Sequence, residues 1–197
     1  MKIKKRNKST TVYYVDVDDI TWGILPSRLL QVFVPVDEDE AELTFEQAAV
    51  LEKEITSYCH RKLLDFLAVR ERSVQECRNF LKKLSLRNDL AAGLILRAQQ
   101  ENHIDDKRFA ELNTISMLSR NKSPQEIRNK LRGHGIPENT ILTALEDYYS
   151  QTDLQDIIRI EILKMLSRYE GFDTSKKREK IFSHLYRKGF DYETVKL

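Results

Sequence analysis

Ser123-Pro-Gln-Glu-Ile-Arg-Asn-Lys-Leu-Arg-Gly-His-Gly-Ile136 has the features of one complete short helix. Ser123 and Glu126 have capping-box spacing, in which two side chains satisfy each other's free backbone N–H groups at a helix start. Pro124 occupies the first helical position, where proline is favoured because its missing N–H would have no partner there. Gly135 suits the left-handed residue that ends a helix. The stretch therefore predicts an amphipathic helix between the serine and the last glycine.

The same pattern occurs in three places along the chain. Residues 73–86 match 123–136 at an offset of 50, and residues 185–190 match 131–136 at an offset of 54. The pairs that match at the offset of 50 are Ser73 and Ser123, Glu76 and Glu126, Arg78 and Arg128, Leu81 and Leu131, and Leu86 and Ile136. A recurring helical unit predicts tandem repeats, because stacked units share an apolar core that a single unit lacks.

Further helix starts and apolar periodicity outline the helices around these copies. Thr44 with Gln47 and Thr152 with Gln155 repeat the capping-box spacing. Apolar residues at helical spacing follow each start. The expected helices cover about 45–69, 74–84, 89–102, a helix from 105 or 106 with Phe109, Leu112 and Ile115 on its apolar face, 124–132, 137–149, a helix from 153, 175–188, and a last short helix after Asp191.

The N-terminal part of the chain has a different pattern. Residues 12–17 and 20–24 are rich in β-branched and aromatic side chains, and Asp18-Asp19 lies between them. This arrangement predicts a hairpin with a two-residue turn. A lone hairpin is marginal in water, so we expect it to pack on residues 29–36 or on the first long helix. The acidic stretch 37–42 then suggests a solvated linker.

Composition and hydropathy indicate a soluble protein. Hydrophobic residues make up 41% of the 197 residues and charged residues 32%, and no apolar run approaches the roughly 20 residues of a membrane span. The basic N-terminus precedes no apolar stretch, which argues against a secretory signal and favours the cytoplasm. We therefore expect a mainly α fold of tandem three-helix repeats in an elongated curved solenoid, with a small N-terminal β-hairpin extension. The expected parts are residues 1–43 (hairpin extension and acidic linker), 44–104, 105–150 and 151–197 (helical repeats one to three).

Sequence patterns give no sign of a catalytic, metal or cofactor site. The chain has no GxxxxGKS/T phosphate loop, no GxSxG and no HExxH. Cys59 and Cys77 do not form a CxxC pair, so we expect two buried thiols rather than a disulfide framework or a zinc site. The four histidines share no recurring position, which favours structural roles for them. We expect no enzyme activity and no cofactor.

Lys and Arg concentrate in the second and third repeats, whereas acidic residues concentrate at 37–54. The stretch 107–135 has seven basic residues against two acidic ones, and the stretch 176–188 has six against one. Exposed helix faces carry such residues by default, but their recurrence favours a basic stripe that binds phosphates or an acidic protein groove. The candidate binding residues are Lys107, Arg108, Arg120, Lys122, Arg128, Lys130, Arg132, Lys176, Lys177, Arg178, Lys180, Arg187 and Lys188.

Segments from about residue 60 to the end of the chain resemble the RecX family. His103-Ile-Asp-Asp-Lys-Arg-Phe-Ala110 is similar to the segment that opens the second RecX repeat, and 123–136 is similar to the segment that follows it. Residues 76–81 resemble the first-repeat form, and 180–195 resemble the C-terminal signature. The N-terminal hairpin is similar to an extension that some members carry. The chain departs from common family residues at Ser85, Asn113, Ser123 and His134, which puts individual contacts in doubt.

The resemblance implies a regulator of homologous recombination and DNA repair. RecX-like proteins bind along the filament of the RecA recombinase on DNA and inhibit its recombinase, ATPase and co-protease activities, without a cofactor. The resemblance implies as partners the RecA filament and the single- or double-stranded DNA within it. We also expect no membrane partner and a monomeric chain. We expect binding to DNA or to the filament to weaken as the salt concentration rises. Joint charge reversal of Arg128, Lys130 and Arg132 should weaken it too. The alternatives are a stand-alone helical DNA-binding protein and a general helical adaptor for another acidic partner.

Overall fold

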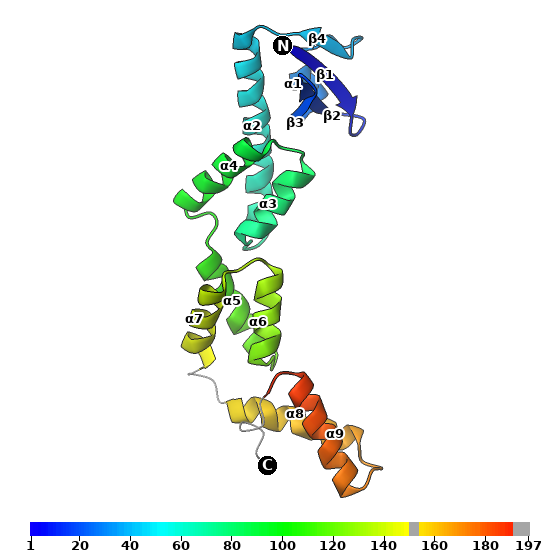
Figure 1. Cartoon of the computed structure of the whole chain (residues 1–197), viewed down its shortest axis with the longest axis vertical. Coiled ribbons are helices and arrows are strands. Elements are labelled where there is room, and N and C mark those ends of the chain that lie inside the picture. The colour runs from blue at the N-terminus through cyan, green and yellow to red at the C-terminus, as the bar shows by residue number, and fades with distance from the viewer. Residues whose placement is uncertain (150–153, 191–197) are drawn as a thin grey trace. The chain divides into compact units, whose positions relative to one another are not determined.

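The structure is a computed structural model that describes residues 1–149 and 154–190, and the chain divides into two compact units, 1–105 and 106–197. Unit 1 contains β1 (Lys2–Asn7), β2 (Val12–Val17), β3 (Ile20–Pro26), α1 (Ser27–Leu30), β4 (Glu40–Glu42), α2 (Phe45–Ala68), α3 (Val74–Lys83) and α4 (Asn88–Gln100). The described part of unit 2 contains α5 (Asp106–Leu118), α6 (Pro124–Gly133), α7 (Glu138–Tyr149), α8 (Leu154–Arg168) and α9 (Thr174–Arg187) (Figure 1). The expectation of a mainly helical chain with a small N-terminal β extension is confirmed, whereas solenoid curvature and the four-part division stay predictions.

The N-terminal extension is a four-stranded antiparallel sheet in the order β3-β2-β1-β4. The predicted hairpin is its β2–β3 part. Asp18 and Asp19 both have left-handed backbone angles (φ 47° and 63°), as a two-residue type I′ turn requires. The prediction of a free acidic linker was wrong in part, because Glu40–Glu42 forms β4. There Glu40 pairs with Lys2 at 2.5 Å and with Lys4 at 3.3 Å, so cross-strand ion pairs favour the edge strand.

The sheet packs on the first long helix, as the sequence suggested. Val15, Val17 and Leu25 of the sheet share one apolar core with Leu51 and Ile55 of α2. At Gly23 a Cβ atom would lie 2.6 Å from Cγ2 of Ile55, so the strand approaches the helix too closely for any side chain. Trp22 is buried in the same core, so its ring packs inside unit 1.

The three copies of the sequence repeat adopt the same local structure. Ser85, Gly135 and Gly189 take left-handed angles (φ 53°, 75° and 87°) directly after α3, α6 and α9. The following N–H then donates to the carbonyl five residues earlier, at 3.3, 3.1 and 3.1 Å respectively, which is the Schellman ending of a helix. In the first two copies a side-chain contact repeats as well, because Gln75 donates to Asn79 at 3.0 Å and Gln125 donates to Asn129 at 3.0 Å.

The capping boxes at Thr44, Ser73 and Ser123 are formed, which confirms three of the predicted helix starts. The fourth, at Thr152, and the short helix expected after Asp191 lie outside the described residues. The third middle helix begins after Asp173, whose side chain accepts from the Lys176 N–H. None of the described helices is long and apolar enough to span a membrane.

The apolar face predicted for α5 was wrong in part. Leu112 and Ile115 are 50% and 45% exposed, whereas Phe109, Ala110 and Thr114 are buried. The reason is that α6 and α7 both pack on the Phe109 side of the helix. The core of α8 and α9 includes Ile157, Ile158, Met165, Ile181, Leu185 and Phe190.

Candidate functional site

Two arginines of the expected basic stripe are bound to one carboxylate. Glu138, at the start of α7, accepts from Nε of Arg128 at 2.5 Å and from Nε of Arg132 at 2.7 Å. These bonds hold the pKa of Glu138 below its usual range, with Arg132 the largest cause. The two guanidinium groups therefore tie α6 to α7, and much of their charge is balanced inside the chain.

Two lysines of the stripe are paired with glutamates one helical turn away. Lys107 lies 3.9 Å from Glu111, and Lys122 lies 2.9 Å from Glu126. Although partial burial alone would raise the pKa of Glu126, the backbone N–H of Ser123 and the Lys122 ammonium lower it overall. Such exposed pairs contribute little stability and are screened by salt, so both ammonium groups stay accessible to an anion.

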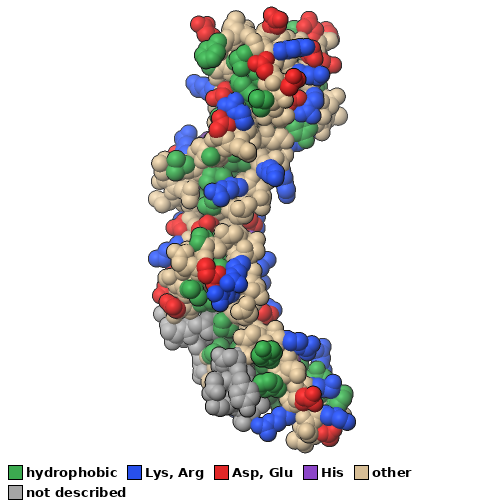
Figure 2. Space-filling view, in the orientation of Figure 1, with side chains coloured by type: hydrophobic (Ala, Val, Ile, Leu, Met, Phe, Trp, Pro, Cys, Tyr) green, Lys and Arg blue, Asp and Glu red, His purple; other side chains and the backbone are tan. Residues whose placement is uncertain are grey.

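Four other basic side chains have no acidic partner among the residues that the structure describes. Within residues 1–149 and 154–190, no carboxylate lies within 4.0 Å of Arg120, Lys130, Lys177 or Arg178. Arg120, Lys130 and Arg178 are exposed, and Arg108 on α5 is half-buried. Figure 2 shows Lys and Arg side chains gathered around α9 in the lower part of the view. These groups give unit 2 an excess of positive charge that is open to a partner.

The basic residues of α9 differ in their surroundings. Lys180 lies over the rings of Tyr169 and Phe172, with Nζ 5.6 and 5.0 Å from the ring centroids. Lys176 pairs loosely with Asp173 at 3.7 Å, and Arg187 Nε donates to the Ser183 carbonyl at 3.2 Å. The ring contacts fix the Lys180 stem while its ammonium remains exposed.

Lys188 is set apart from the other basic residues, because it points to a buried carboxylate. Its Nζ lies 2.6 Å from Glu161 of α8, which also receives Lys164 at 3.0 Å and His184 at 3.4 Å. Burial alone would raise the pKa of Glu161, but Lys188, Lys164 and His184 outweigh it and lower the pKa to about 2. The Lys188 charge thus balances a charge inside unit 2.

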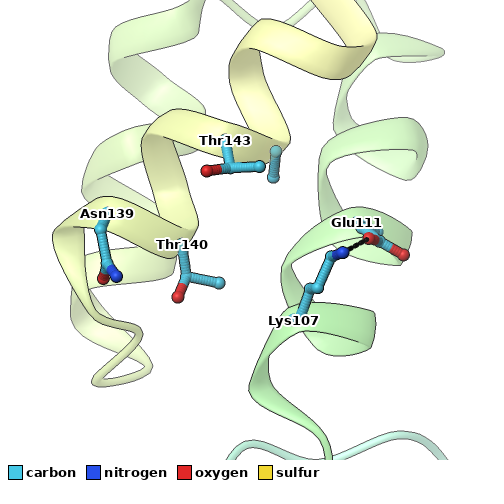
Figure 3. A pocket seen from close by; sticks show the side chains of 6 residues that line it. Lys107, Glu111, Asn139, Thr140 and Thr143 are labelled. Carbon is cyan, nitrogen blue, oxygen red and sulfur yellow. Dashed lines mark ion pairs between the residues drawn. The ribbon is translucent and has the colours of Figure 1, made fainter.

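A pocket of about 250 Å³ lies beside Lys107, between α5 and α7 (Figure 3). Asn139, Thr140 and Thr143 of α7 line one side, and the Lys107–Glu111 pair lines the other. Sequence reasoning missed these polar α7 residues, although the spacing of Asn139 and Thr143 places them on one helix face. The pocket adds hydroxyl and amide groups to the accessible Lys107 ammonium.

The described residues hold no group of three or more His, Cys, Asp or Glu placed to bind a metal ion. Burial raises the pKa of the Cys59 thiol to about 11, so it stays protonated and unreactive at neutral pH. His134 contacts the ring of Phe109 edge-on at 5.2 Å, and His184 faces Glu161, so both have structural contacts. The arrangement offers charge recognition by exposed side chains.

No protein-family model matches the chain. The chain is 31% identical over 162 residues to the regulatory protein RecX of Oceanobacillus iheyensis, covering 81% of this chain and 57% of that protein. It is 28% identical over 203 residues to the regulatory protein RecX of Streptococcus pyogenes serotype M1, covering all of this chain and 75% of that protein. The chain thus spans little more than half the length of the first of these relatives.

Two crystal structures share the fold. A regulatory protein RecX matches with a TM-score of 0.73 at 21% identity, over 99% of this chain and 98% of the other. RecX from Lactobacillus salivarius matches with a TM-score of 0.65 at 26% identity, over 71% of this chain and 91% of the other. By its sequence relatives and by its fold, the chain belongs to the RecX family of regulatory proteins.

Proposed function

We propose that the chain binds along RecA filaments on DNA and limits their recombinase, ATPase and co-protease activities. Support comes from membership of a family of regulatory proteins and from the basic side chains of unit 2. The observation that carries the proposal is a set of exposed basic residues that have no acidic partner in the described part of the chain, Arg120, Lys130 and Arg178. The protein acts in the cytoplasm as a monomer, without a cofactor and without catalysis of its own.

Eleven of the thirteen candidate basic side chains fall into three classes for this role. Arg120, Lys130, Lys177 and Arg178 offer charge that is not balanced by a described carboxylate. Lys107, Lys122 and Lys176 each pair with one carboxylate at the surface and exchange that contact at low cost, and Lys180 keeps its ammonium exposed above two rings. Arg128, Arg132 and Lys188 bind carboxylates within unit 2 and thereby stabilise its helix packing. We therefore assign the contact with phosphates, or with acidic groups of the filament, mainly to the first two classes.

The test is the ATPase activity of RecA on single-stranded DNA with increasing amounts of this chain. We expect inhibition at amounts well below one chain per RecA monomer, because blocking a growing filament needs few molecules. Inhibition only at levels that coat the DNA would favour a stand-alone DNA-binding protein. Absence of any effect on RecA would contradict the proposal and favour an adaptor for another acidic partner.

A further inference from the structure

The second repeat contains an internal carboxylate that shows where an anion fits on this helical unit. Glu138 lies between Arg128 and Arg132 and accepts a hydrogen bond from each of them. All three side chains come from a helix pair, α6 and α7, that follows the repeat pattern. The first repeat has a corresponding pair, α3 and α4, which begin 50 residues earlier than α6 and α7.

The first repeat keeps the two cations and lacks the carboxylate. Arg78 and Lys82 stand 50 residues before Arg128 and Arg132, and the neutral Asn88 stands 50 residues before Glu138. This sets two uncompensated positive charges beside an amide. Both basic side chains are exposed, and no carboxylate of the described chain lies within 4.0 Å of either.

The acidic residues near this site are engaged elsewhere. Asp89 follows Asn88, and both its oxygens accept from Arg87, at 2.7 and 2.8 Å. Glu76 on α3 accepts from Arg70 at 2.5 Å and from the backbone N–H of Ser73 at 3.2 Å. Neither carboxylate is therefore available to neutralise Arg78 and Lys82.

A pocket of about 340 Å³ opens beside the two cations. Leu86, Ala91 and Ala92 contribute its apolar wall. At the offset of 50, Ile141 and Leu142 stand where the first repeat has the two alanines. The smaller side chains leave room in the first repeat for a group from outside the chain.

We propose that the first-repeat pocket, lined by Arg78, Lys82 and Asn88, binds an aspartate or glutamate side chain of a partner protein. Glu138 shows that this helix pair accommodates a carboxylate with two charge-assisted hydrogen bonds. The apolar wall suits an aliphatic neighbour of that acidic residue, whereas a phosphodiester backbone offers charge along its whole length. This site lies outside the basic residues assigned above, so it goes beyond the proposed function and is tested without a recombinase.

The test is an NMR titration of the full chain with the capped peptide acetyl-Ala-Glu-Leu-Ala-amide. We expect shifts of the Arg78 Nε–H and Asn88 side-chain amide signals. The peptide with Gln in place of Glu should bind at least about tenfold more weakly, since it offers no charged acceptor. Equal shifts from both peptides, or no shift with the Glu peptide, would overturn the proposal.

Reciprocal variants sharpen the test. Asn88→Glu supplies the internal carboxylate and should weaken peptide binding by at least about tenfold. Gln99→Glu adds the same charge at an exposed position farther along α4 and should leave binding unchanged. Glu138→Asn removes the internal carboxylate but leaves Ile141 and Leu142 in place, so peptide shifts at Arg128 should stay smaller than those at Arg78. The comparison of the Glu and Gln peptides on the unchanged chain remains decisive if a variant fails to fold.

The alternative occupant is a phosphate of nucleic acid. A short oligothymidylate that shifts the Arg78 and Asn88 signals, where the Glu peptide does not, would assign the site to phosphate and overturn the proposal. Binding of the Glu peptide that is lost in Asn88→Glu and kept in Gln99→Glu would support it. Because no RecA is present, failure here leaves the ATPase test of the proposed function intact.

Discussion

The ammonium of Lys188 lies 2.6 Å from Oε2 of Glu161, a residue that is only 4% exposed. The pair joins the end of α9 to the middle of α8, 27 residues apart in sequence. Lys164 and His184 complete the surroundings of the carboxylate. A buried charge is tolerated only when it is paired and hydrogen-bonded, so this cluster makes the packing of α8 on α9 depend on ionisation.

The pKa of Glu161 predicts a loss of stability at acid pH. Its pKa is about 2 in the folded chain, below the ordinary 4.5 of the unfolded chain, so the ionised form is favoured by folding. This stabilisation, on the order of 2 to 3 kcal/mol, is fully present above about pH 4.5 and is lost as pH falls toward 2. Thermal unfolding followed by far-UV circular dichroism should show this decline.

The variant Glu161→Gln separates the contribution of Glu161 to stability from that of the other carboxylates that titrate in the same pH range. At pH 7 it should unfold at a lower temperature than the parent, because it leaves the Lys188 ammonium without its counter-charge. The difference should shrink as pH falls toward 3, where the parent itself begins to lose the ionised form. A difference that stays constant from pH 7 to pH 3 would contradict the role assigned to Glu161.

Gly189 predicts a second effect on stability. Its φ is +87°, and a Cβ atom there would lie 2.2 Å from Cβ of Gln125. Gly189→Ala therefore combines a left-handed backbone with a clash and should destabilise the chain by on the order of 2 kcal/mol. Gly133→Ala is the matched control, because its Cβ would meet nothing within 4 Å and alanine is the better helix former. Equal urea midpoints for the two variants would contradict the predicted clash at Gly189.

The turn of the hairpin predicts a stabilising change. Asp19 has a φ of 63°, an angle that glycine adopts without strain, so Asp19→Gly should stabilise unit 1 by about 0.5 kcal/mol. Asp18 is kept, because its Oδ1 accepts from the Lys2 N–H at 2.7 Å. Asp19→Val should have the opposite sign, since β-branched residues avoid this angle. Fluorescence of Trp22, the only tryptophan, measures the unfolding of unit 1 in urea.

Local signals in the sequence predicted the helices well. The capping boxes at Ser73 and Ser123 and the helix ends at Gly135 and Gly189 each involve residues at most five positions apart. The structure that each of them forms therefore depends little on the rest of the chain. The strand Glu40–Glu42 was missed because it is stabilised by pairing with β1, nearly forty residues earlier. Its acidic composition alone resembles that of a solvated linker.

The surroundings of the basic residues could not be predicted from spacing. Arg128 and Arg132 are joined by Glu138, which belongs to the next helix, and Lys188 is directed to Glu161 of the preceding one. Which lysine faces solvent and which faces a carboxylate is decided by how the helices pack. The repeat offset nevertheless identified Arg78 as the counterpart of Arg128, and Arg78 lines the first-repeat pocket.

Charge reversal at the accessible basic residues should weaken binding to RecA filaments. Replacement of Arg120, Lys130 and Arg178 by Glu should reduce affinity on the order of tenfold or more and flatten its dependence on salt, because fewer phosphate counterions are released. Arg128 and Arg132 are left intact, since their loss would also release Glu138 from α6. The control replaces three exposed basic residues of unit 1, Arg28, Lys53 and Arg61, by Glu and should keep inhibition of the RecA ATPase. Equal inhibition by both triple variants at every salt concentration would mean that these unit 2 residues do not contact the filament.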